Sequence, residues 1–209
     1  MDVVCRVVRG SGRLETLLVG GCSQLSNITT QLIASHLPTT LRRLDVGGLP
    51  NLIDIDLQDL KKCGVLRSLS VRACAKLTDA GVAHLASLCA RQCKRAAADA
   101  EAGGGAGPSE GFACEAVVMR SLDLGGLGRM SDKALASLLQ SAAGLQRLDL
   151  SGCSGLSPTG IVDAFGALPE PRRHAIERLT MTGLPQPVES KVDWERLAEL
   201  LGPDAKLVH

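Results

Sequence analysis

The chain has 209 residues, of which 45% are hydrophobic, and its formal net charge at pH 7 is +1. These values are typical of a globular chain that can bury a sizeable core, and the balanced charge gives no general attraction to nucleic acid or to an acidic membrane surface. No apolar stretch approaches the roughly 20 residues that a transmembrane helix needs.

Residues 1–13 form an N-terminal lead-in, whose first part reads as the end of a helix or as a capping element. It is too short and too often interrupted by charge to be a secretory signal.

A phrase of eleven residues then recurs six times, with apolar residues at its first position and at offsets 3, 5 and 8. It begins at Leu14, Leu41, Leu66, Met119, Leu145 and Ile176, and the starts lie 25 to 31 residues apart except for one gap of 53. The apolar residues at offsets 3 and 5 alternate with mostly polar ones, which predicts a strand with one buried face. This period and consensus are the signature of leucine-rich repeats.

The second half of each repeat changes to helical spacing, as in Val82, Leu85 and Leu88. Thr78 or Asp79, and Ser131 or Asp132, are candidate N-caps. One strand and one helix cannot bury their own apolar sides, but stacked repeats can. The sequence therefore predicts an α/β solenoid of about six repeats, with parallel strands on the concave face and helices on the convex face.

Offset 8 alternates between cysteine and leucine, and all six residues there are expected in the core: Cys22, Leu49, Cys74, Leu127, Cys153 and Leu184. The three cysteines lie two repeats apart, too far for a disulfide, so we expect them buried and reduced. Reduced thiols favour an intracellular protein, either cytoplasmic or cytoskeletal and ciliary, with the nucleus and an organelle matrix as alternatives.

The segments "LRSLSVRACAKLTDAGVAHLASLC" (66–89) and "LQRLDLSGCSGLSPTGI" (145–161) resemble the cysteine-containing leucine-rich repeats of F-box/leucine-rich-repeat proteins. The resemblance implies a solenoid that presents a substrate to a cullin-type ubiquitin ligase. Two features depart from that family: cysteine occupies offset 8 only in repeats 1, 3 and 5, and only 13 residues precede the first repeat, so we expect no F-box.

Repeats 1 to 3 span residues 14–93 and repeats 4 to 6 span residues 119–184, with an Ala/Gly-rich insert at 94–118 between them. Residues 96–102 are expected to extend the third helix, and 103–111 to form a flexible loop. Residues 185–209 predict a capping segment with a short helix containing Trp194, which ends at Gly202-Pro203. The lead-in shows no comparable pattern, so we expect the N-terminal end of the stack to be uncapped.

The outward strand positions supply the candidate protein-binding residues of the concave face: Arg43, Asp45, Arg67, Arg72, Arg120, Asp123, Arg147, Asp149 and Arg178. Guanidinium groups bind carboxylates bidentately, so this set is suited to a polar peptide. The alternative is that neighbouring repeats pair these charges among themselves.

No catalytic, cofactor or metal site is predicted. The sequence contains no nucleophile elbow, phosphate loop or His-Glu-x-x-His motif, and the spacing of His84, Cys89, Cys93 and Cys114 matches no common structural zinc motif. The doublets Gly20-Gly21, Gly47-Gly48 and Gly125-Gly126 recur where strands end and are expected to form turns.

The prediction is a non-catalytic protein-protein interaction scaffold with one or more protein partners in a multi-subunit complex. A structural or docking subunit of an axonemal or organellar assembly is favoured by the small size and the insert. The alternative is a substrate-recognition module of a ubiquitin ligase. The concave face has no aromatic residue, so tight binding there would depend on arginine, shape and area.

Overall fold

The computed structural model describes residues 2–22, 25, 28–102, 118–184 and 191–208. Within these residues one all-parallel sheet has seven strands, which follow one another in sequence order. The strands are β1 (Thr16–Leu18), β2 (Arg43–Asp45), β3 (Ser68–Ser70), β4 (Ser121–Asp123), β5 (Arg147–Asp149), β6 (Arg178–Thr180) and β7 (Lys206–Val208). The expected α/β class is confirmed.

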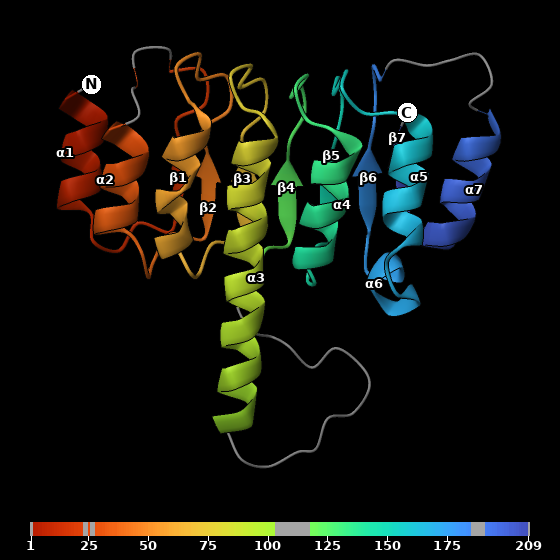
Figure 1. Ribbon diagram of the computed structural model, residues 1–209. Coiled ribbons are helices and arrows are strands. Elements are labelled where there is room, and N and C mark those ends of the chain that lie inside the picture. The colour runs from red at the N-terminus through yellow and green to blue at the C-terminus, as the bar shows by residue number, and fades with distance from the viewer. Residues whose placement is uncertain (1, 23–24, 26–27, 103–117, 185–190, 209) are drawn as a thin grey trace.

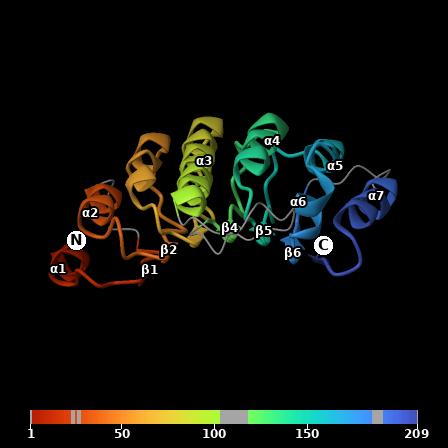
Figure 2. The ribbon, with the colours of Figure 1, turned by 90° about the horizontal axis from the view of Figure 1, so that it is seen from below.

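Helices connect the strands and lie in a second row, so that the molecule forms an arc with the strands along its inner side (Figures 1 and 2). The α-helices are α1 (Asp2–Gly10), α2 (Ile28–His36), α3 (Asp79–Ala102), α4 (Asp132–Ser141), α5 (Pro158–Gly166), α6 (Glu170–His174) and α7 (Lys191–Leu201). Between β2 and β3 the connection is two 3₁₀ helices, η1 (Asp54–Leu57) and η2 (Asp59–Lys62).

The strand register is the one that the repeated phrase predicts. The central leucine of each strand is paired with the next, from Leu17 in β1 to Leu179 in β6, and these side chains are at most 9% exposed. Because side chains alternate along a strand, the residues on either side of each leucine point away from the core. A core thus runs between the strand row and the helix row.

The turn after each strand places offset 8 in the core of repeats 2 to 6. The Cys74 thiol donates to the Val46 carbonyl oxygen at 3.3 Å, and the Cys153 thiol donates to that of Leu124 at 3.2 Å. Each thiol thus reaches back to the preceding repeat. Leu49, Leu127 and Leu184 are also buried.

Cys22 is exposed, so its predicted burial was wrong. Its turn follows β1, the first strand of the sheet, and no preceding turn lies there to cover the thiol or to accept its hydrogen bond. The glycine doublets do form turns: the second glycine has a positive φ at Gly21, Gly48 and Gly126, which glycine adopts without a steric cost.

A ladder of carboxylates links the helix starts of successive repeats. Asp54 accepts from the backbone N–H and hydroxyl of Thr78, Asp79 does the same for Ser131, and Asp132 for Ser157, at 2.6 to 2.9 Å. Ser131 also caps α4 as predicted, accepting from the Ala134 N–H at 3.4 Å. The bonds from Asp79 to Ser131 join repeat 3 to repeat 4. The two repeats that flank the insert in sequence are therefore stacked on each other like the other repeats.

The third helix runs to Ala102, which confirms its predicted extension, and projects beyond the other helices (Figure 1). The loop expected at 103–111 and Cys114 lie outside the described residues. The chain returns at Met119, whose N–H donates to Gln92 Oε1 of α3 at 2.9 Å. Gln92 Nε2 in turn donates to the carbonyl oxygen of Leu66 at 2.8 Å, so one buried amide holds both sides of the insert.

Both ends of the stack are covered. The expectation of an uncapped N-terminal end was wrong, and the interpretation of the lead-in as a capping element is confirmed, because α1 packs on α2 and buries Val8. At the other end α7 buries Leu197 and Leu201 and ends before Gly202, as predicted. The tail also adds β7, parallel to β6, which the repeated apolar pattern does not predict. Within the part of the chain that the structure describes, no helix is long and apolar enough to cross a membrane.

Candidate functional site

Two rows of outward side chains cross the inner face of the sheet, one on each side of the buried leucines. The strand register aligns the residues of each row. The strand-entry row contains Thr16, Arg43, Ser68, Ser121, Arg147 and Arg178. The strand-exit row contains Leu18, Asp45, Ser70, Asp123, Asp149 and Thr180.

The aspartates of the strand-exit row stabilise the turns that follow them. Asp45 Oδ1 accepts from the Gly47 N–H at 2.8 Å, and Asp123 and Asp149 accept in the same way from residues 125 and 151, at 3.1 and 2.8 Å. One oxygen of each carboxylate is therefore used within its own repeat. The other oxygen remains for a second partner.

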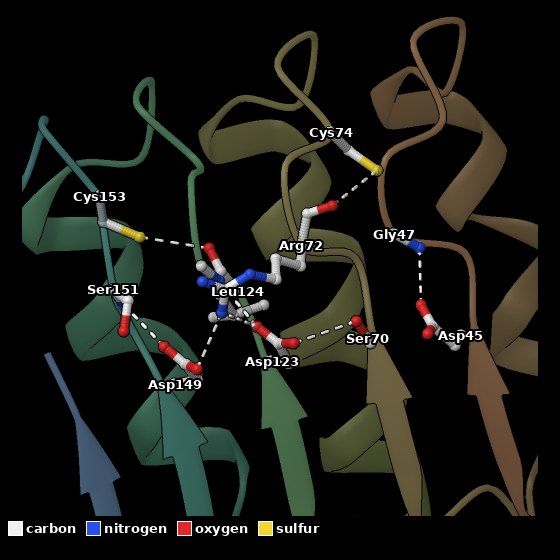
Figure 3. A network of polar contacts seen from close by, with 11 residues as sticks. Asp45, Gly47, Ser70, Arg72, Cys74, Asp123, Leu124, Asp149, Ser151 and Cys153 are labelled. Atoms are coloured by element: carbon white, nitrogen blue, oxygen red, sulfur yellow. Dashed lines mark hydrogen bonds and ion pairs between the residues drawn. The ribbon is translucent and has the colours of Figure 1, made fainter. Parts of the chain in front are cut away.

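Arg72 contacts two of these aspartates, Asp149 through its second oxygen and Asp123 through the same oxygen that accepts from Gly125. It lies at offset 6 of repeat 3, and its Nη1 is 3.0 Å from Asp149 Oδ2 and 3.5 Å from Asp123 Oδ1 (Figure 3). Ser70 Oγ donates to Asp123 Oδ2 at 3.2 Å. A Cβ at Gly125 would lie 2.7 Å from the Arg72 guanidinium, so the glycine leaves the space that this side chain crosses. Three of the predicted binding residues are thus paired with one another, one arginine with two aspartates.

The other predicted charges lie outside the cluster of Arg72, Asp123 and Asp149, and most of them have no ion pair within the described part of the chain. Arg147 pairs with Glu177 at 3.3 Å, both largely exposed, and exposed pairs of this kind contribute about 0–1 kcal/mol. Among the described residues, no ion pair within 4.0 Å involves Asp45 or these four arginines: Arg43, Arg67, Arg120 and Arg178. They are the charges of the inner face that remain available to a ligand.

A hollow of about 420 Å³ opens at the strand-exit side of the first repeats, lined by Leu18, Asp45, Ser70, Arg72 and glycine backbone. Leu18 is 63% exposed. A second hollow of about 250 Å³ lies over β4 to β6 and includes Arg147, Asp149 and Arg178. Sequence reasoning did not select Leu18, although a leucine in a row of otherwise polar residues was a signal.

The buried cysteines are chemically quiet. Burial raises the pKa of the Cys63 and Cys153 thiols to about 11 and that of Cys89 to about 12, so little thiolate forms near neutral pH. All seven described cysteines are free. Among the described residues, no group of three or more His, Cys, Asp or Glu side chains could hold a metal ion.

Comparisons with known proteins bear on the fold alone. No protein-family model matches the chain, and no curated protein matches it. A chain of the crystal structure of the Rad7 and Elc1 complex in yeast aligns over 99% of this chain with a TM-score of 0.66 and 16% identity, and this chain spans 43% of its length. The C-terminal domain of Caenorhabditis elegans tropomodulin aligns over 96% of this chain and 90% of its own, with a TM-score of 0.50 and 11% identity.

Proposed function

We propose that this chain is a non-catalytic protein-interaction module, a cysteine-containing leucine-rich-repeat solenoid whose concave face binds a segment of a partner protein. The observation that carries the proposal is the hollow around Asp45. There an exposed leucine lies beside a half-buried carboxylate with no cation within ion-pair distance among the described residues. Binding sites typically combine an apolar lining with a few polar or charged groups, and this hollow offers both.

The arginines extend this site along the face. Arg43 lies two residues before Asp45 on β2 and is exposed, and Arg178 occupies the equivalent position on β6. Guanidinium groups at such positions can bind carboxylates of an extended segment. Arg72, Asp123 and Asp149 are excluded from this proposed set because they already pair with one another. The proposed binding residues are Leu18, Asp45, Arg43, Arg67, Arg120 and Arg178.

For the biological setting, we propose a structural or docking subunit of a larger intracellular assembly, axonemal or organellar. The alternative is a substrate-recognition module of a cullin-type ubiquitin ligase, which the resemblance to F-box/leucine-rich-repeat proteins favours. The similarity in fold to a chain crystallised in a complex of two proteins, Rad7 and Elc1, supports protein partners in either setting.

The test replaces Leu18 by a photo-crosslinking amino acid in the full chain, expressed in its own cells. A matched control carries the crosslinker at Lys133, an exposed residue of α4 on the outer row. We expect a discrete crosslinked partner from position 18, lost when Asp45→Asn removes the charge and keeps the turn acceptor. Equal crosslinking from position 133, or crosslinking that persists in Asp45→Asn, would contradict the proposal.

The identity of the crosslinked protein decides between the two settings. Subunits of an axonemal or organellar complex, recovered in stoichiometric amount, support the first. Cullin-ligase components support the second.

A further inference from the structure

A second charged surface lies where α3 leaves the stack, away from the strand rows. There η2 and α3 enclose a hollow of about 140 Å³. Four cations surround it together with Gly64 and Gln92: Lys61, Lys62, Arg91 and Arg95. We refer to this site as the basic hollow.

The charge of the basic hollow is poorly compensated. Lys62 pairs with Asp59 at 2.9 Å, and among the described residues no ion pair involves the other three cations. Arg91 and Arg95 lie one helical turn apart, a spacing at which like charges destabilise a helix. The fold therefore gathers mutually repelling charges that a bound anion would stabilise.

The base of this site is held in place. Gln92 lies on the same turn of α3, is 2% exposed, and forms the hydrogen bonds to Leu66 and Met119. Arg95 is seated against Gly64, where an added Cβ would lie 3.2 Å from its Nη1. Cations on an anchored base lose less freedom on binding than cations on a mobile loop.

We propose that the basic hollow docks an acidic segment of a partner protein, with one carboxylate seated between Lys61, Arg91 and Arg95. Its volume equals that of about four or five water molecules, at roughly 30 Å³ each, which suits one acidic side chain. This site is separate from the concave face, so the inference does not depend on the proposed concave binding.

The observations favour a protein over a nucleic acid. Nucleic-acid-binding domains are strongly basic overall, whereas this chain has a net charge of +1. Single-strand binding uses exposed aromatic platforms. Of the aromatic residues that the structure describes, Phe165 is fully buried and Trp194 packs on the core at α7.

The test measures binding of a fluorescein-labelled octaglutamate peptide to the full chain by fluorescence polarisation at low ionic strength. The double variant Arg91→Glu/Arg95→Glu reverses two charges of the hollow, and Arg6→Glu/Arg9→Glu makes the same change at two exposed arginines of α1, outside both proposed binding sites. We expect the first to weaken binding at least about tenfold, a loss of about 1.4 kcal/mol, and the second to change it less than about twofold.

Three results would overturn the inference: no binding by the parent chain, equal weakening in both variants, or tighter binding of duplex DNA or phosphatidylserine vesicles than of the peptide. Circular dichroism checks folding. If the reversal variant unfolds, Arg91→Gln/Arg95→Gln replaces it, and unchanged binding by that variant refutes the site. Crosslinking from position 18 is measured in the Arg91→Glu/Arg95→Glu variant as well. If that crosslinking is retained, a failure of the basic hollow can be told apart from a failure of the proposed concave site.

Discussion

Replacing Gln92 by methionine tests how the two sides of the insert are joined. Methionine has a similar length and fits an apolar setting, but it neither donates to the Leu66 carbonyl oxygen nor accepts from the Met119 N–H. These bonds measure 2.8 and 2.9 Å, and the side chain is buried. Each buried polar group left without a partner costs about 1–3 kcal/mol. We therefore expect the free energy of unfolding to fall by about 2–6 kcal/mol, from a total that is typically about 5–15 kcal/mol.

Urea unfolding followed by circular dichroism measures this loss. Gln31→Met is the matched control, because Gln31 is exposed on α2 and such changes stay within about 0.5 kcal/mol. If Gln92→Met is as stable as the control, Gln92 does not hold the returning chain, and the reasoning is refuted.

Gln92→Glu adds a dependence on pH to the same test. An ionised glutamate still accepts from Met119 but faces the Leu66 carbonyl oxygen, so burial and that oxygen should raise its pKa in the folded state. Its protonated form can donate to Leu66, so the stability difference from the parent should be smallest below the unfolded pKa of about 4.3 and should grow as pH rises through the folded pKa. A difference that does not change with pH would contradict this arrangement.

Three further predictions use the same unfolding measurements. Asp132→Ala removes the acceptors for the Ser157 N–H and hydroxyl, at 2.9 and 2.7 Å, and should lower the free energy of unfolding by about 1–3 kcal/mol. Asp132→Asn should lower it by about half as much, because one acceptor remains. Equal stability of both variants and the parent would show that the ladder does not contribute to stability. Cys74→Arg places an unpaired charge in the core and should lower the melting temperature severely; a parental melting temperature would refute its inward position. Burial raises the pKa of the Cys153 thiol in the folded state to about 11, so the stability that this thiol contributes is complete below the unfolded pKa of about 8.5 and is lost as pH rises towards 11. The free energy of unfolding of Cys153→Ala should therefore decline less steeply than that of the parent over this pH range. An identical decline in both proteins would contradict the burial of this thiol.

The residues of the concave face show why the binding site could be predicted only in part. Alternation along each strand identifies which side chains point outward, and it selected Arg72, Asp123 and Asp149 correctly as surface charges. Pairing of these charges among themselves was the stated alternative, but the partners could not be predicted, because Arg72 reaches past β4 to β5 and uses space left by Gly125. The basic hollow was missed for a related reason: Lys61 and Arg91 come from different helices of different repeats, and only packing brings them together.

The sequence by itself determined the strand register, the α/β class and the buried position of Cys74 and Cys153, because a repeated apolar pattern requires the same side chains to face inward in each repeat. Only the tertiary structure decided what happens where the repetition stops. Cys22 is exposed because no turn precedes its own, α1 and β7 cover the two ends, and Gln92 connects the two sides of the insert. These outcomes depend on neighbours in space, and no periodicity within one repeat contains that information.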